Sequence, residues 1–111
     1  MTYNTDIKKD YYGLTAETEI NLNKATDEGA MMLRITSSKR SSGTVSASAS
    51  VIYRKPDGCF STMLFQDYSK TIAQAKIARV NEKTLGEFHA KALENVAAVL
   101  EAVNAHYNLA A

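Results

Sequence analysis

The chain has 111 residues, of which 45% are hydrophobic and 23% are charged, and its formal net charge is +1 at pH 7. This length suits one domain with one core, and the composition differs from that of disordered chains. The near-neutral charge argues against non-specific binding to DNA or to a membrane surface, so an ionic partner would have to be met by a local group of charges.

The first part of the chain predicts an arm followed by two strands. Residues 1–13 are polar without a sustained period, so we expect an N-terminal arm there. Residues 15–22 alternate as in a half-buried strand, and the members of one face are Ala16, Thr18, Ile20 and Leu22. A turn over residues 24–29 leads to a second strand, "AMMLRIT", whose apolar face consists of Met31, Leu33 and Ile35.

Two further strands follow a loop rich in serine. Residues 37–43, "SSKRSSG", contain the pair Lys39 and Arg40, and the third strand then runs to Arg54. One face of this strand holds Val45, Ala47, Ala49 and Val51, and the other holds Ser46, Ser48, Ser50 and Ile52. "KPDG" predicts a turn, and "CFSTMLFQ" predicts a fourth strand. Such short connections favour an antiparallel meander, which we expect over residues 15–66.

The remaining sequence predicts a connector and a helix. Residues 67–83 combine spacing typical of helical turns with helix-breaking residues, so we treat them as a connector. "TLGE", from Thr84 to Glu87, matches a capping box, and apolar residues follow at three- and four-residue spacing. Gly86, inside the first turn, costs about 1 kcal/mol relative to alanine, which suits either fraying or close approach of another segment. A helix is therefore expected over residues 84–107.

The predicted fold is one α+β domain spanning residues 1–111, in which a four-stranded antiparallel β-meander packs against a long C-terminal helix. The small alanines of the third strand would let the helix sit close, so the serine face is expected to point away from it. Three interpretations of that serine face stay open: ordinary solvent exposure, contact between copies of the chain, or the floor of a ligand site. Apolar residues on both faces of the other strands favour a homo-oligomer.

His89 falls near the centre of the apolar stripe of the predicted helix, so we expect it to be buried. It is either a neutral imidazole hydrogen-bonded across the core or a ring in an interface or ligand pocket. A serine hydrolase would need a serine placed beside His89, and the chain has so many serines that such a match is uninformative. The chain carries no specific catalytic or metal-binding motif, and we expect no enzymatic activity.

Basic residues are concentrated in the middle of the chain. Residues 44–83 hold six basic and three acidic side chains, whereas residues 84–111 hold one and three. Several of the basic residues lie at strand ends or in connectors, where a guanidinium group can bind a phosphate with two hydrogen bonds. Aromatic side chains close in sequence could stack on a base, so this region suits a nucleotide. The alternative is a solvated charge pattern. No phosphate-binding glycine-rich loop is present, which argues against an ATPase or a dehydrogenase.

The chain's one cysteine, Cys59, cannot form an intrachain disulfide or a zinc site, which suits a reducing compartment. We find neither an apolar run of about 18 residues nor a charged-then-apolar leader, so no membrane span and no signal peptide are expected. The predicted location is the cytoplasm, which would be that of a bacterial host if the protein is encoded by a phage.

The stretch "VIYRKPDGCFSTMLFQDYSKTI", followed by "ARVNEKTLGEFHAKAL" and a helix ending in "AHY", resembles the small phage anti-defence proteins that act as sponges for Thoeris immune signals. The resemblance covers about residues 45–107. It implies a non-catalytic homo-oligomer that captures a cyclic ADP-ribose isomer or a cyclic oligonucleotide, with arginines on phosphate and an aromatic residue on adenine. The ligand-binding positions that it implies are Arg54, Phe65, Arg79, Asn81 and His89.

The sequence therefore predicts a protein that sequesters a small nucleotide signal, with no cofactor, no metal, no membrane partner and no specific DNA target. The alternative is an inhibitor, similar to anti-CRISPR proteins, that binds a host defence protein complex through its methionine-rich sheet surface and the loop with Lys39 and Arg40. A single-strand nucleic-acid binder is a third interpretation, and the near-neutral charge argues against it.

Overall fold

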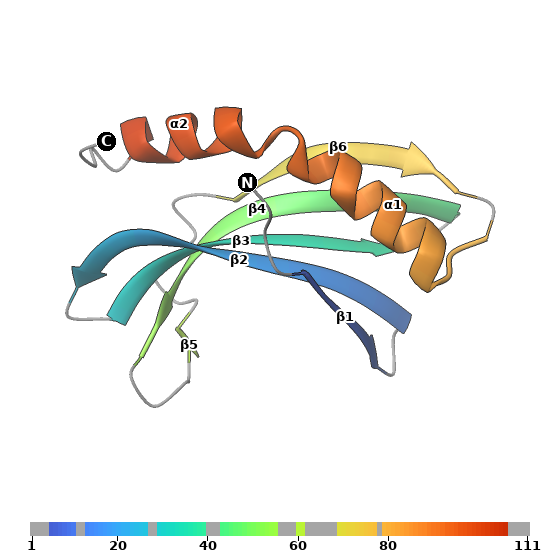
Figure 1. The fold of residues 1–111 in the computed structure, drawn as a ribbon, viewed down its shortest axis with the longest axis horizontal. Helices are drawn as coiled ribbons and strands as arrows, with labels where there is room; N and C mark the ends of the chain where they lie inside the picture. The colour runs from blue at the N-terminus through green and yellow to red at the C-terminus, as the bar shows by residue number, and fades with distance from the viewer. Residues whose placement is uncertain are drawn as a thin grey trace.

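The computed structural model describes residues 5–10, 13–26, 29–39, 43–55, 60–61, 69–77 and 79–106. Over these residues, six strands form one antiparallel sheet and two helices lie on one side of it (Figure 1). The strands are β1 (Thr5–Asp10), β2 (Gly13–Thr26), β3 (Gly29–Lys39), β4 (Thr44–Arg54), β5 (Phe60–Ser61) and β6 (Ser69–Lys76), and the helices are α1 (Glu82–Leu93) and α2 (Val96–His106). The predicted α+β class and antiparallel sheet are confirmed.

Strands β1 to β4 follow one another across the sheet, and β5 and β6 both pair with the remaining edge of β4. β6 pairs with β4 from Thr44 to Ser50, and β5 pairs with Tyr53 and Arg54. The predicted meander is correct for β2, β3 and β4, and residues 60–61 of the predicted fourth strand form β5. The rest of that predicted strand lies outside the described residues.

The prediction omits two strands. β1 lies in the segment predicted to be an arm, and it pairs with β2 from Thr5 opposite Thr18 to Asp10 opposite Gly13. β6 lies in the segment predicted to be a connector. Its pairing with β4 contains a register shift that leaves Ile72 without a partner residue on β4, so the alternation of the strand is interrupted. The register shift explains why residues 69–76 lack the period of two that identifies a strand.

Both helices pack on the apolar face of the sheet, as the alternating pattern predicts. The residues of β4 on this face, Val45, Ala47, Ala49 and Val51, are each 0% exposed. One core cluster contains Leu85, Phe88 and Ala92 of α1 with Ala16, Val45 and Ala47 of the sheet. The other contains Val96, Val99 and Val103 of α2 with Met31, Leu33, Ile35, Ala49 and Val51. The expectation that the alanine face of β4 receives the helical layer is therefore correct.

The C-terminal helical segment begins earlier than predicted. Asn81 is the N-cap of α1: Asn81 Oδ1 accepts from the Thr84 amide at 2.9 Å, and Thr84 Oγ1 accepts from the Asn81 amide at 2.9 Å. The capping box is thus formed by Asn81 and Thr84 and not by Thr84 and Glu87. Asparagine is a strong N-cap, and threonine can return the reciprocal bond here.

The predicted single helix is also interrupted. The amides of Glu94 and Asn95 donate to the carbonyls of Lys91 and Ala92, each at 3.1 Å, which tightens the chain between α1 and α2. Val96, Val99 and Val103 remain on the sheet side of α2, so the apolar spacing continues through the break and does not reveal it. In the part of the chain that the structure describes, no helix is long and apolar enough to cross a membrane.

Candidate functional site

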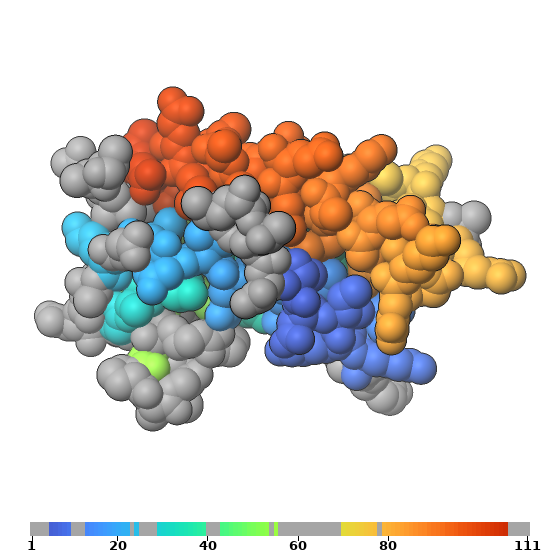
Figure 2. Space-filling model, viewed as in Figure 1, coloured from blue at the N-terminus to red at the C-terminus, as the bar shows by residue number. Residues whose placement is uncertain are grey.

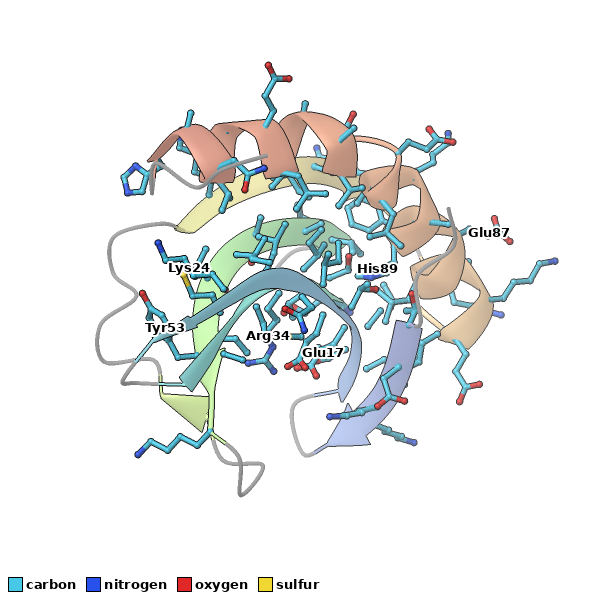
Figure 3. The ribbon with its side chains drawn as sticks, turned by 60° about the vertical axis from the view of Figure 1, so that its left-hand side comes forward. Glu17, Lys24, Arg34, Tyr53, Glu87 and His89 are labelled. Carbon is cyan, nitrogen blue, oxygen red and sulfur yellow. The ribbon has the colours of Figure 1, made fainter. Side chains whose placement is uncertain are left out.

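His89 lies between α1 and the sheet, and it is 1% exposed (Figure 3). Ser37 Oγ of β3 lies 2.6 Å from His89 Nδ1, and Thr18 Oγ1 of β2 lies 2.7 Å from His89 Nε2. Thr18 Oγ1 is also 2.9 Å from Thr5 Oγ1, which extends the chain of hydrogen bonds to β1. Both ring nitrogens of His89 therefore have a hydrogen-bond partner within the core.

Burial lowers the pKa of His89 below its ordinary value, so the ring is neutral at pH 7. A neutral imidazole has one donor and one acceptor, and each neighbouring hydroxyl can take the complementary role. Ser37 is 0% exposed, so it is not an accessible nucleophile. The geometry matches the interpretation of His89 as a neutral imidazole hydrogen-bonded across the core.

The sheet face opposite the helices carries an ion-pair network centred on Glu17 of β2. Arg34 Nη2 of β3 donates to Glu17 Oε1, and Lys8 Nζ of β1 lies 3.3 Å from Glu17 Oε2. Figure 3 shows Glu17 and Arg34 together on the side of the sheet away from α1 and α2. Burial alone would raise the pKa of the Glu17 carboxyl, but the hydrogen bonds and charges of Arg34, and then of Lys8, outweigh it and lower that pKa below its usual range.

The serine face of β4 points to the same side as this network and is only partly accessible. Ser48 lies opposite Thr36, and Ser50 lies opposite Arg34. Ser48 and Ser50 are half-buried, whereas Ser46 is only 4% exposed. The serine face is therefore left uncovered by the helices, as predicted, but it is less open than a fully solvated strand.

Exposed cations gather at the end of the molecule where α1 begins. Lys39 is the last residue of β3 and lies opposite Val45, and Lys76 is the last residue of β6 and lies opposite Thr44, so the two lysines flank the start of β4. Arg79 and Lys83 follow in the connection to α1 and in its first turn. Figure 1 shows these strand ends and the start of α1 together on the right. We refer to Lys39, Lys76, Arg79 and Lys83 as the basic end.

The backbone that carries the basic end is held by hydrogen bonds. The Ile77 amide donates to the Gly43 carbonyl at 2.9 Å, which ties the end of β6 to the start of β4. Thr84 Oγ1 donates to the Arg79 carbonyl at 3.0 Å. The four side chains themselves are exposed, and among the described residues none of them forms an ion pair or a hydrogen bond with another side chain. The arrangement is a fixed backbone frame with four solvated cations.

No protein-family model, curated protein or solved structure matches the chain. Within the described residues, no group of three or more His, Cys, Asp or Glu side chains is placed to hold a metal ion.

The ligand-binding residues predicted from the sequence lie in different places. Arg79 and Asn81 are at the basic end, and His89 lies further along α1 in the core. Arg54 is the last residue of β4, whose first residue is at the basic end. A strand of 11 residues at about 3.3 Å per residue places these two ends roughly 30 Å apart. One small ligand could therefore contact both Arg54 and Arg79 only if two copies of the chain contribute.

The side chain of Arg54, together with Phe65 and Arg40, lies outside the described residues. Lys39, predicted to contact a partner, belongs to the same basic end as Arg79. No sequence pattern singles out Lys76 or Lys83. Lys76 could have been identified by its position at a strand end. The register shift at Ile72 interrupts the alternation of β6, so the sequence does not reveal that strand or its end.

Proposed function

We propose that the protein is a non-catalytic binding protein that captures a small nucleotide immune signal, a cyclic ADP-ribose isomer or a cyclic oligonucleotide, in the cytoplasm of a bacterial host. The proposal extends the resemblance to phage anti-defence sponges. The observation that carries it is the basic end, where four exposed cations come from one end of the molecule and form no side-chain ion pair with any residue that the structure describes. The phosphates of a nucleotide would supply the missing negative charge.

Arg79 is the principal contact in this proposal. Its side chain is exposed, while its carbonyl is held by Thr84, so the guanidinium extends from a fixed point of the backbone. A planar guanidinium can donate two parallel hydrogen bonds to a phosphate, which gives orientation as well as affinity.

Asn81 and His89 have supporting roles. The Asn81 side chain caps α1 and thereby fixes the position of Arg79 and Lys83 relative to the helix. His89 anchors α1 to β2 and β3 through two hydroxyl groups, and neither ring nitrogen is left for proton transfer to a ligand. This use of His89 favours binding without turnover.

A homo-oligomer is part of the proposal. Arg54 lies at the opposite end of β4 from the basic end, so its contribution to a site with Arg79 would come from a second copy. Native mass spectrometry of protein purified from cells would report the number of subunits and any retained small molecule in the same measurement.

Isothermal titration calorimetry with cyclic ADP-ribose isomers, cyclic dinucleotides and larger cyclic oligonucleotides tests the function directly. We expect stoichiometric binding of at least one of these ligands and its recovery unchanged after release. Absence of binding by all of them at high protein concentration would remove the proposal, and conversion of a bound ligand to product would show that the protein is an enzyme.

The basic end also suits the alternative of an inhibitor that binds a host defence protein complex, because an acidic protein surface would match the same cations. Lys39 would be the described contact of that interface. Affinity purification from a bacterial lysate separates the two functions. A sponge should bring down no protein in stoichiometric amount, whereas an inhibitor should bring down its target.

A further inference from the structure

We propose that β1 is a dimer interface: β1 of one copy pairs antiparallel with β1 of a second copy about a two-fold axis at Ile7, so that the two sheets become one. The inference goes beyond the proposed function, because it concerns a surface that the basic end does not use. In this dimer β1, β2 and β3 of both copies separate the two β4 strands. A ligand site shared by Arg54 of one copy and Arg79 of the other would therefore need a further interface.

The outer edge of β1 is open to a second chain. β1 stands at the end of the strand order, and among the described strands it pairs with β2 alone. The side chains of residues 5–9 are all exposed, and Figure 2 shows β1, in dark blue, on the surface beside α1. The core cluster beneath α1 contains no described residue of β1. An edge strand of this kind presents unpaired backbone N–H and C=O groups that can pair with another strand.

The edge formed by β6 is less suited to such pairing. The register shift at Ile72 interrupts the regular row of backbone groups on β6, and irregularities of this kind protect an edge from a second chain. The six residues of β1 pair with β2 without a shift. β1 therefore offers the more regular backbone of the two edges.

Ile7 gives the edge of β1 an apolar centre. It is the large hydrophobic side chain that is exposed among the described residues, at 37%. Ile7 lies opposite Ala16, on the sheet face that packs on α1. A two-fold axis perpendicular to the joined sheet relates antiparallel strands and keeps the helices of both copies on one side. Ile7 of each copy would then lie opposite the other, with the two Cβ atoms about 5 Å apart.

Asp6 and Lys8 are complementary in this register. With Ile7 opposite itself, Asp6 of each copy lies opposite Lys8 of the other, which gives two pairs of opposite charge. Asp6 also lies opposite Glu17 of its own sheet, and it forms no ion pair with a residue that the structure describes. The second copy would supply the cation that this pair of carboxylates needs. The Lys8 side chain, 60% exposed and with three donors, can contact Asp6 of the second copy as well as Glu17.

The neighbouring registers are unfavourable. A slip of one residue would place side chains of one face opposite those of the other face, so the alternatives differ by a shift of two. One of these alternatives places Asp6 opposite Asp6, and the other places Lys8 opposite Lys8. Like charges directly opposite one another destabilise a strand pair. Of the three registers, the one centred on Ile7 joins an apolar centre to opposite charges.

Cysteine cross-linking tests the register. In a Cys59→Ser background, which removes the chain's one native cysteine, Ile7→Cys places two thiols directly opposite across the axis. Oxidised glutathione should then produce a disulfide-linked dimer on a gel run without reductant. The matched control is Lys9→Cys, because this position lies opposite Thr5 of the second copy and roughly 13 Å along the strand from its own equivalent. We expect Ile7→Cys to cross-link at least about tenfold faster than Lys9→Cys, and equal rates would overturn the register.

Sedimentation equilibrium of the full chain tests the charge pairs. We expect a concentration-dependent equilibrium between monomer and dimer. Asp6→Lys should weaken the dimer at least about tenfold, since it turns two attractive pairs into two repulsive ones. Asp6→Lys/Lys8→Asp exchanges the two charges and should restore the dimer to within about threefold of the unaltered protein. The matched control, Glu101→Lys, makes the same change in net charge as Asp6→Lys at an exposed position of α2 and should leave the dimer unchanged.

A monomer at every concentration up to the solubility limit would overturn the inference. An equal loss of the dimer in Glu101→Lys would do the same, because net charge would then explain the effect of Asp6→Lys. Circular dichroism shows whether the charge variants keep their fold, and the cysteine pair tests the interface independently of them. Dimers joined at Ile7 that bind no cyclic nucleotide would support the interface and contradict the proposed function, whereas a monomer that binds one would contradict the interface and leave ligand capture standing.

Discussion

The imidazole of His89 on α1 lies 2.6 Å from the hydroxyl oxygen of Ser37 on β3, although the two residues are 52 positions apart in the sequence. The other ring nitrogen lies 2.7 Å from Thr18 Oγ1 on β2. One buried side chain thus joins the helical layer to two strands of the sheet. Buried polar groups that lose their partners are costly, so these hydrogen bonds should contribute strongly to the stability of the fold.

The substitution His89→Ala should destabilise the protein by about 3 kcal/mol, since it leaves a cavity and removes a partner from two buried hydroxyl groups. Urea unfolding followed by circular dichroism measures the change. The control is Lys91→Ala at an exposed position of α1, where we expect a change within about 0.5 kcal/mol. A loss of less than about 1 kcal/mol for His89→Ala would contradict a structural role of this size.

Stability should fall as the pH is lowered below 6.5, because the pKa of His89 is lowered from 6.5 by burial. Above that pH the ring is neutral in both states and the full stability is present. Below it the unfolded chain takes up a proton that the folded chain does not, so the free energy of unfolding decreases until the pH reaches the lowered folded-state pKa.

This pH effect can be separated from that of Glu17. The pKa of Glu17 is lowered from 4.5, so its contribution is lost only as the pH falls below 4.5. Urea titrations between pH 7.5 and 5 should therefore show a slope in the unaltered protein that is smaller in His89→Ala. Identical slopes in the two proteins would show that His89 does not take up its proton differently in the folded and unfolded states.

The sequence predicts the core of the fold well where the alternation is regular. Ala47 and Ala49 lie under the helices, and Val96 and Val103 lie on the sheet side of α2, as their spacing indicates. The register shift at Ile72 interrupts the alternation of β6, so the sequence does not identify that strand. The apolar spacing continues through the break between α1 and α2, so it does not reveal the break. Local spacing reports which face a residue occupies, but it does not report irregular pairing.

The candidate site is less predictable than the core. Burial of His89 follows from its place on the helix, but its partners Thr18 and Ser37 come from two strands whose register the sequence does not specify. Lys39 and Lys76 come to the same end of the sheet because each ends a strand that pairs with β4, and the register puts them on opposite faces, Lys39 opposite Val45 and Lys76 opposite Thr44. The sequence shows which segments carry charge, and only the strand order shows which charges become neighbours.

Gly86→Ala should stabilise the protein by about 0.5 to 1 kcal/mol, the difference in helix propensity between the two residues. An added Cβ would lie 3.6 Å from Ile7 Cδ1, an ordinary van der Waals contact. Figure 2 shows β1 lying against α1 in this region. The reverse change, Ala90→Gly at an exposed position of α1, is the matched control and should cost about 1 kcal/mol. Thermal unfolding of both variants checks the pair, and a destabilised Gly86→Ala would show that β1 cannot adjust to the added methyl group.

The two ion pairs of Glu17 should differ in strength. The side chain of Arg34 is 23% exposed and that of Lys8 is 60% exposed. Glu17→Ala should cost about 2 kcal/mol, since it removes a hydrogen-bonded carboxylate from a largely buried arginine. Lys8→Ala should cost no more than about 0.5 kcal/mol, as is typical of an exposed pair. Urea unfolding measures the free energy of unfolding of both variants. Equal losses would show that the ion pair with Arg34 adds no stability beyond the ion pair with Lys8.

Asn81 allows the helix cap to be separated from anion binding. Asn81→Asp and Asn81→Ser both keep a side chain that caps helices well, so each should unfold within about 0.5 kcal/mol of the unaltered protein. Asn81→Asp also places a negative charge between Arg79 and Lys83. A charge about 4 Å from a bound phosphate contributes about 1 kcal/mol in water, so binding of the proposed nucleotide ligand should weaken by roughly fivefold. Asn81→Ser should bind normally. Calorimetry of the two variants decides the matter, because equal affinities would show that the anion is bound away from the start of α1.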